Sequence, residues 1–223
     1  MNPSTPLLLR VAAVLLAVLV PVVLVLTNVR LLLTPAYVDL AYRVPGFPDD
    51  PYGMSMEDRE RHADIDLDYL LNDAGPEFLG DLRFEDGTPA YNAREVRHMV
   101  DVKRLVQAAL RVWIGALAVG VVVGLILWRS GGGAELRLGV HWGSQASLIA
   151  IGVLTVGLMA AFGILFVGFH RLFFEGDTWL FLNTDTLIRL FPVRFWQQAF
   201  ITLAGLTLVE SAVLLAVTKG PGR

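Results

Sequence analysis

Residues 166–196 read FVGFHRLFFEGDTWLFLNTDTLIRLFPVRFW, and they link the end of one hydrophobic segment to the start of another. Nine of these 31 residues are Phe or Trp, against about three expected from the aromatic fraction of the whole chain, 10%. Amphipathic rings prefer the boundary between lipid and water. The stretch therefore predicts a site at the end of a membrane span. Its titratable residues are His170, Arg171, Glu175, Asp177, Asp185, Arg189 and Arg194.

The composition of the chain is typical of an integral membrane protein. Of its 223 residues, 55% are hydrophobic and 17% are charged, and the mean hydropathy is +0.58. Ordinary soluble domains are less apolar than this. The absence of cysteine excludes disulfide bonds, thiolate catalysis and cysteine-ligated metals. No pattern in the chain indicates nucleic-acid binding.

Four segments are apolar and long enough to cross a bilayer, which takes about 20 residues. We predict an α-helical integral membrane protein, a four transmembrane helix bundle with a small extracellular cap of mixed or irregular structure. The first apolar run is longer than the core of a signal peptide and has no clear cleavage site, so we expect it to be retained. The predicted divisions are the N-terminus and first span at 1–33, the cap segment at 34–104, the second span at 105–128, a loop at 129–145, the third span at 146–169, an aromatic loop at 170–194, the fourth span at 195–217 and a tail at 218–223.

The orientation of the spans follows from the positive charges of the short loops. The N-terminus, the 129–145 loop and the tail carry five cations and one acid between them, and they are predicted to be cytoplasmic. The segment 34–104 holds 16 acidic residues and eight Lys or Arg, but long segments obey the rule weakly. Both termini are therefore expected inside the cell, with the cap and the aromatic loop outside.

The cap segment contains two readable local patterns. Residues 64–71 mix carboxylates with apolar side chains at a spacing that fits a helix or an alternating strand. Residues 88–101 are typical of a turn that leads into a helix, with Asn92 as the N-cap and Glu95 at the capping-box position.

Two of the four histidines stand at the predicted outer ends of spans. His98 precedes the second span and His170 follows the third, so the two could meet on one face of a helix bundle. Asp101 lies three residues after His98, where a helix would place it on the same face and let it orient the imidazole. Asp177 or Glu175 could orient His170 in the same way. Polar helix ends that never meet remain the alternative interpretation.

The other polar candidates favour structural roles. We expect His62 to be a solvated surface group within a charged run, and His141 to be an interfacial residue beside Trp142. Glu210 lies inside the fourth span, where pairing or snorkelling near the cytoplasmic face is expected, with Lys219 about two turns away. Two histidines with scattered carboxylates lack a metal-binding spacing, so no metal and no cofactor are predicted.

Two segments carry a resemblance to a known family. RHMVDVK at residues 97–103 and FHRLFFEGDTWLF with DTLIRLFPVRFW, within residues 169–196, resemble the Lit family of bacterial lipoprotein intramolecular transacylases. The resemblance covers most of the chain in layout and is specific in residues 97–104 and 169–196. It implies an enzyme that moves the sn-2 acyl chain of a diacylglyceryl-cysteine lipoprotein from the glycerol oxygen to the cysteine α-amine.

The resemblance also implies a site. Family members use two histidines, which match His98 and His170 in this chain. Imidazole can act as base or acid near neutral pH, and which histidine has which role stays open. An oxyanion must also be stabilised, for which Arg171, Arg189, a backbone N–H or the second histidine is available. The predicted acyl-chain wall consists of Phe173, Phe174, Trp179 and Phe181.

The expected setting is a monomer in the bacterial cytoplasmic membrane, with membrane lipid around it and the active site at the outer leaflet. One alternative is a non-enzymatic membrane protein whose cap binds a partner or senses a ligand. Another is a hydrolase that uses water at the same site and releases fatty acid. The geometry of the imidazoles separates catalysis from a structural role, because an acid–base pair must lie within roughly 3 to 7 Å to reach one ester group.

Overall fold

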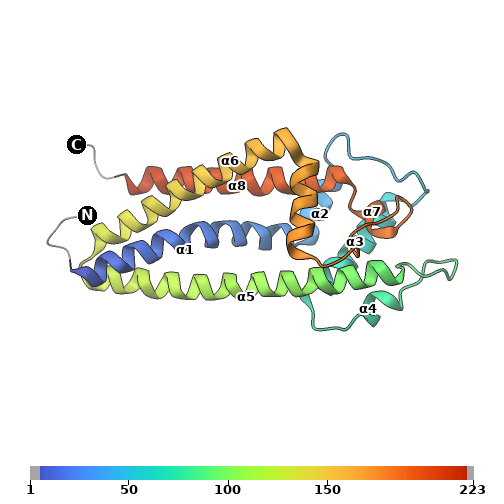
Figure 1. The fold of residues 1–223 in the computed structure, drawn as a ribbon, viewed down its shortest axis with the longest axis horizontal. Helices are drawn as coiled ribbons and strands as arrows, with labels where there is room; N and C mark the ends of the chain where they lie inside the picture. The colour runs from blue at the N-terminus through green and yellow to red at the C-terminus, as the bar shows by residue number, and fades with distance from the viewer. Residues whose placement is uncertain (1–5, 220–223) are drawn as a thin grey trace. The chain divides into compact units, whose positions relative to one another are not determined.

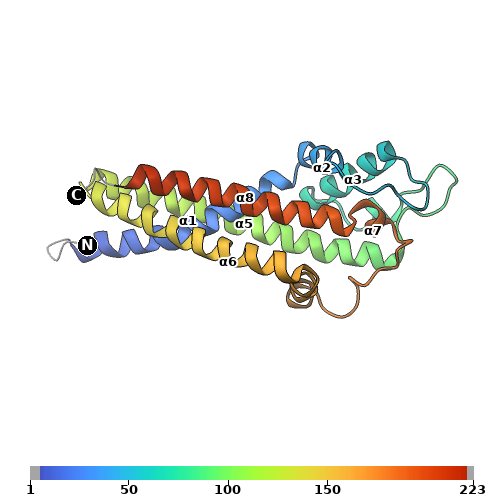
Figure 2. The same ribbon diagram turned by 90° about the horizontal axis from the view of Figure 1, so that it is seen from above.

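A computed structural model describes residues 6–219, so the predictions for residues 1–5 and 220–223, including the basic end of the tail, lie outside it. Four of its helices are long and apolar enough to cross a membrane (Figures 1 and 2). No strand occurs within the described residues. The prediction of an α-helical membrane protein with four long apolar helices is confirmed. These helices are α1 (Leu7–Leu32), α5 (Ala93–Arg129), α6 (Gly133–Phe173) and α8 (Val193–Thr218).

The chain divides into two compact units. The first, here called the span unit, contains Met1–Arg30, Leu110–Met159 and Ile201–Arg223. The second, here called the site unit, contains Leu31–Ala109 and Ala160–Phe200.

Small residues and apolar side chains pack the helices of the span unit. Leu16 of α1 packs with Val123 and Leu127 of α5 in one buried cluster. A Cβ atom added to Gly139 of α6 would lie 2.6 Å from the carbonyl oxygen of Ala13, so the backbones of α6 and α1 approach closely there. This approach requires glycine, because any larger residue would push the two helices apart.

The connection between α5 and α6 is shorter than the predicted loop at 129–145. Helix α6 begins at Gly133, and only a turn separates it from the end of α5 at Arg129. Gly131 adopts a φ of +75°, and the N–H of Gly132 donates to the carbonyl of Leu127. The helix extends through the predicted loop because its first turns have packing partners: Leu136 and Val140 lie against the cluster around Leu127.

Helices α2 (Pro35–Tyr42), α3 (Met56–Leu71), α4 (Glu77–Gly80) and α7 (Thr186–Leu190) belong to the site unit. Residues 64–71 are helical, which decides between the two predicted alternatives for that segment. The capping box of α5 is confirmed, because the N–H of Asn92 donates to Glu95 at 2.8 Å and the N–H of Glu95 donates to Asn92 at 3.1 Å. Side chains cap α2 and α3, through Thr34 and Ser55, and the remaining described cap residues form short helices and turns.

Two buried clusters fill the site unit. The larger joins residues of α3, α4 and α7 to Met99 of α5, and the smaller joins α2 and α3 to Phe195 of α8. The Tyr42 hydroxyl donates to the carbonyl of Leu190 at 2.7 Å. These contacts fix the helix ends that carry the candidate site.

The prediction for His62 is wrong. Its side chain is buried, its Nδ1 lies 2.7 Å from the carbonyl oxygen of Asp58, and its ring packs 5.3 Å from that of Phe84. The buried face of α3 repeats at helical spacing and includes Arg59 and Asp66 as well as His62. The charges of this face made it look solvent-exposed in the sequence.

Two polar residues of the span unit have definite partners. Glu210, for which snorkelling or pairing is predicted from the sequence, accepts a hydrogen bond from the side-chain amide of Asn28 at 2.8 Å. The same amide also donates to Thr207 at 3.1 Å. His141 lies 3.1 Å from the hydroxyl of Thr218 through its Nδ1.

Candidate functional site

His98 lies in the second turn of α5, where it is enclosed by aromatic rings. Its side chain is 7% exposed, and its ring centroid lies 4.8 Å from that of Phe174 and 5.2 Å from that of Phe181, both edge to face. The Nδ1 atom of His98 is buried and has no hydrogen-bond partner within residues 6–219. A buried polar atom without a partner is rare in native proteins, and it often marks a functional position.

His170 lies near the end of α6 and is held by its own helix. Its Nδ1 lies 2.8 Å from the carbonyl oxygen of Phe166, one turn earlier. Since a carbonyl oxygen can only accept, Nδ1 must donate this bond. The rings of Phe166 and Trp179 lie 4.3 Å and 5.2 Å from the imidazole, so the orientation of His170 is fixed by a hydrogen bond and by packing.

The two imidazoles lie close together. Their ring centroids are 6.1 Å apart and their planes differ by 19°. Phe174 contacts both rings, at 4.8 Å from His98 and 5.5 Å from His170. The distance lies within the range that one ester group can bridge. The alternative interpretation, polar helix ends that never meet, is therefore excluded.

Hydrogen bonds fasten the segment after α6 to the start of α5. The carboxylate of Glu95 accepts from the N–H of Leu187 at 2.8 Å, and Thr186 donates to the carbonyl of Ala90. The side-chain amide of Asn92 donates to Asp185 at 3.0 Å. The N-terminal turn of α5 thus anchors both its own backbone and α7. The local sequence identifies Glu95 only as a capping residue, because a partner 92 positions away leaves no local signal.

Of the predicted site residues, Phe174, Trp179 and Phe181 contact one or both histidines. Phe173 is 47% exposed and packs 4.8 Å from Phe169, whose ring lies 5.6 Å from that of His170. Phe166 and Phe169 were missed as contacts of His170. Phe166 lies four residues before His170 and Phe169 lies one residue before it, and this spacing on a helix could have identified both contacts.

Four polar candidates make no described contact with either imidazole. Asp101 pairs with Arg104 at 3.4 Å instead of bonding to His98. Arg189 donates two hydrogen bonds to Asp50, at 2.9 Å and 3.1 Å. Arg171 and Asp177 are exposed, and their proposed roles stay predictions.

The pair of Arg189 and Asp50 is a structural link between α7 and the segment before α3. Burial opposes ionisation of Asp50, but the Arg189 guanidinium and the N–H groups of Met54 and Tyr52 outweigh it and hold the pKa of the carboxyl below its usual range. The guanidinium also lies over the ring of Tyr52, 5.6 Å from its centroid. The guanidinium of Arg189 is thus already paired with a carboxylate. This pairing argues against Arg189 as the group that stabilises the oxyanion.

A second group of buried titratable residues lies in the site unit. Asp66 is 1% exposed and Tyr91 is 3% exposed, and the Tyr91 hydroxyl lies beside the carboxyl. Burial raises the pKa of Asp66 well above its usual value near 3.8, with an opposing effect from Tyr91 and a further rise from the charge of Glu95. This carboxyl is therefore protonated over a wider pH range than an exposed aspartate.

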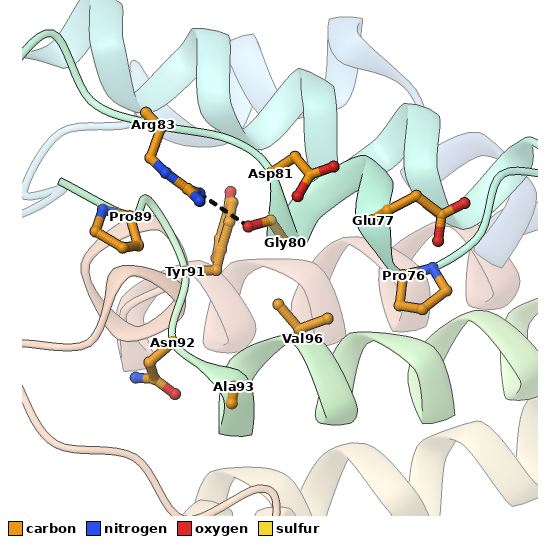
Figure 3. Close-up of a pocket in the computed structure, with 10 residues that line it drawn as sticks. All are labelled: Pro76, Glu77, Gly80, Asp81, Arg83, Pro89, Tyr91, Asn92, Ala93 and Val96. Carbon is orange, nitrogen blue, oxygen red and sulfur yellow. Dashed lines mark hydrogen bonds between the residues drawn. The ribbon is translucent and has the colours of Figure 1, made fainter. Parts of the chain in front are cut away.

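A shallow groove of about 750 Å³ lies on the site unit (Figure 3). Neither His98 nor His170 is among the residues that line it. Tyr91 and Val96 point toward it in Figure 3, and Asn92 and Ala93 line it at the start of α5. Val96 and His98 are two residues apart on a helix, which separates their directions by about 200°. The groove and the histidine pair thus belong to different faces of α5.

The side chains around the pair do not form a recognisable metal site. No three His, Asp or Glu side chains between residues 6 and 219 gather as metal ligands would. The neighbours of the imidazoles are apolar rings, whereas a zinc site requires three or four nitrogen, sulfur or oxygen ligands.

A family model and solved structures both relate this chain to the same family. Residues 14–196 match the family model described as lipoprotein intramolecular transacylase Lit. The structure of the membrane integral Lit from Bacillus cereus, determined in meso, is similar with a TM-score of 0.76 and 20% identity over 94% of each chain. A variant of that protein with one histidine substituted by arginine gives a TM-score of 0.68 and 19% identity, over 95% of this chain and 90% of the other. An uncharacterized protein of Aquifex aeolicus is 27% identical over 92% of each chain. The chain therefore belongs to the lipoprotein intramolecular transacylase family.

Proposed function

We propose that this chain moves the sn-2 acyl chain of a diacylglyceryl-cysteine lipoprotein to the cysteine α-amine, with His98 and His170 at the reacting groups. Family membership supports acyl transfer on a lipoprotein. The observation that carries the residue assignment is the 6.1 Å separation of the two imidazoles inside an aromatic enclosure. The product is a lipoprotein acylated on its N-terminal amine, with a free hydroxyl on the glycerol.

His170 is the base in this proposal. Its Nδ1 donates to the carbonyl of Phe166, so the neutral ring keeps the lone pair on Nε2. A ring held in one tautomer by such a bond presents that lone pair in a fixed direction. Nε2 of His170 then takes the proton of the attacking amine.

His98 is the hydrogen-bond donor to the oxyanion. Its Nδ1 is enclosed without an acceptor, and an orphaned N–H is rarer in proteins than an unsatisfied lone pair. The favoured neutral tautomer therefore carries its proton on Nε2. A neutral imidazole N–H can polarise a carbonyl and stabilise the oxyanion that forms from it.

The reaction needs no group beyond these two rings and the substrate. The amine nitrogen attacks the ester carbon while His170 takes a proton from it, and the carbonyl oxygen becomes an oxyanion bonded to His98. The intermediate collapses with cleavage of the bond to the glycerol oxygen, which receives the proton from His170. Amine and ester belong to one molecule, so correct positioning supplies much of the rate.

The aromatic surroundings suit an acyl ester. Phe174 and Phe181 enclose His98, and exposed rings such as Phe169 and Phe173 extend apolar surface beside His170. We place this surface at the outer leaflet with both termini in the cytoplasm, on the basis of the positive charges of the short loops. The protein acts there as a monomer without a cofactor.

A synthetic diacylglyceryl-cysteine peptide tests the proposal with purified protein. With a free α-amine, mass spectrometry should find the acyl chain on nitrogen and no loss of total mass. The matched control is the same peptide with its amine acetylated, which should remain unchanged. Release of fatty acid from both peptides at equal rates would instead identify a hydrolase, and two unchanged peptides would contradict catalysis altogether.

A further inference from the structure

Two of the rings that cover the histidines come from one short segment after α6. Trp179 lies 5.2 Å from His170, and Phe181 lies 5.2 Å from His98. Leu180 stands between them in the chain, with its side chain exposed. The backbone at Leu180 therefore decides where both covering rings sit.

Arg94 of α5 holds this backbone. Its Nη1 donates to the carbonyl of Leu180 at 2.9 Å. The other hydrogen bonds from the start of α5, those of Asn92, Glu95 and Ala90, reach positions 185–187, beyond the covering rings. Among the described hydrogen bonds from α5, that of Arg94 alone reaches the segment between Trp179 and Phe181.

The remaining bonds of this segment are internal to it. The N–H of Leu180 donates to the carbonyl of Asp177, the N–H of Leu182 donates to Asp185, and Trp179 donates to the carbonyl of Gly176. The bonds within residues 176–180 shape a turn without fixing its position, and the bond of Leu182 leads to α5 only indirectly, through Asp185 and its bond with Asn92. Ring contacts are weakly directional, so the bond from Arg94 supplies the direct link between the two covering rings and the helix that carries His98.

Water competes with the amine for the ester in this reaction. If water attacks, its oxygen bonds to the acyl carbon, the bond to the glycerol oxygen breaks, and the proton moves through His170 to that oxygen. The products are a free fatty acid and a lipoprotein whose amine stays unmodified. An enzyme that transfers acyl groups therefore gains from a cover that keeps water out.

We propose that Arg94 is a positioning residue that holds the Trp179–Phe181 segment over His98 and His170 and so favours transfer to the amine over transfer to water. This inference rests on the proposed transacylase function. Arg94 touches neither the substrate nor the reacting atoms in this account. It acts through the two rings.

The test compares Arg94→Ala, Arg94→Lys and Arg97→Ala with the wild type, using the free-amine lipopeptide. Arg97 is the matched control, an exposed arginine on the next turn of α5 with no described contact. The readout is the ratio of free fatty acid to N-acylated product, measured with kcat, KM and the thermal midpoint. A residue with a purely structural role would change the midpoint without changing this ratio.

We expect Arg94→Ala to raise the share of free fatty acid about fivefold, the effect of losing one hydrogen bond, with its thermal midpoint close to that of the wild type. Arg94→Lys should recover part of the loss because its amine can still donate, and Arg97→Ala should match the wild type. An unchanged ratio in Arg94→Ala would overturn the proposal, and so would failure of that variant to fold. A wild type that makes no N-acylated product would instead overturn the transacylase function on which it rests.

Discussion

The span unit and the site unit are stabilised by different kinds of contact. In the span unit, glycines let backbones approach, and buried Ser144 and Ser147 bond to carbonyls of their own helix. In the site unit, long-range hydrogen bonds of the capping residues Asn92 and Glu95, an ion pair and stacked aromatic rings join segments that are far apart in the sequence. Every residue predicted to take part in catalysis or substrate binding lies in the site unit. Substitutions in the two units should therefore separate stability from activity.

The largest expected effect comes from the histidines. His170→Ala should lower the initial rate of acyl transfer by about 10³-fold, the scale of a lost general base. His98→Ala should cost about 10²-fold, the scale of a lost oxyanion donor. His98→Gln should recover part of that loss because its amide can still donate a hydrogen bond.

Rates measured on the free-amine lipopeptide, with thermal midpoints as the control for folding, check this ranking. If His98→Ala were the slower variant and His98→Gln no better than it, the two roles would have to be exchanged.

Close packing in the span unit predicts the next effect. A Cβ atom on Gly143 would lie 2.6 Å from Cβ of Val20 and 2.8 Å from the carbonyl oxygen of Ala17, whereas one on Gly152 of the same helix would meet nothing within 4 Å. Gly143→Ala should therefore lower the free energy of unfolding by about 1–3 kcal/mol. Gly152→Ala, the matched control, should be neutral or slightly stabilising.

Thermal unfolding in detergent measures the stability of both glycine variants. Their kcat values, measured at a temperature at which both are folded, show whether activity changes as well. If the two units are as distinct as the contacts indicate, Gly143→Ala keeps the kcat of the wild type once folded. A loss of kcat equal to that of His98→Ala would show that the division between stability and activity is wrong.

The polar contact of the span unit should have a smaller effect. Asn28 is fully buried and joins α1 to Thr207 and Glu210 of α8. Interhelical hydrogen bonds in membranes contribute about 0.6 kcal/mol on average and up to about 1.7 kcal/mol. A double-mutant cycle with Asn28→Ala and Glu210→Ala should give a coupling energy in that range, and additive effects would mean that the bond contributes nothing.

The smallest effect concerns Asp66 and depends on pH. Because burial raises the pKa of Asp66 in the folded state, unfolding releases a proton, and stability falls as pH rises from the usual value near 3.8 toward the raised pKa. Asp66→Asn removes this loss without changing the size of the side chain. The thermal midpoint of Asp66→Asn minus that of the wild type should be larger at pH 8 than at pH 4. An equal difference at the two pH values would show that ionisation of Asp66 is not coupled to folding.

Local patterns explain what the sequence could predict. Hydropathy alone located the four long helices, and the spacing of Asn92 and Glu95 predicted the capping box, because both depend on residues within one segment. The meeting of His98 and His170 followed from their places at the ends of spans and from the family resemblance.

Contacts between distant segments could not be predicted. The partner of Arg189 is Asp50, 139 positions away, so an arginine that looked free for an anion is in fact paired. His62 shows a related limit: hydropathy cannot tell which face of a charged helix is buried when Arg59 and Asp66 lie on that face too. The extra length of α6 depends likewise on its packing against α5.

The proposed function assigns acyl transfer on a lipoprotein to His98 and His170. Its most direct test is mass spectrometry of the N-terminal peptide of a reporter lipoprotein, in cells that lack other N-acylating enzymes. We expect the wild type to place an acyl chain on the amine, and His98→Ala and His170→Ala, expressed at equal levels, to leave the diacylglyceryl form almost unchanged. N-acylated product from both variants at the level of the wild type would contradict it.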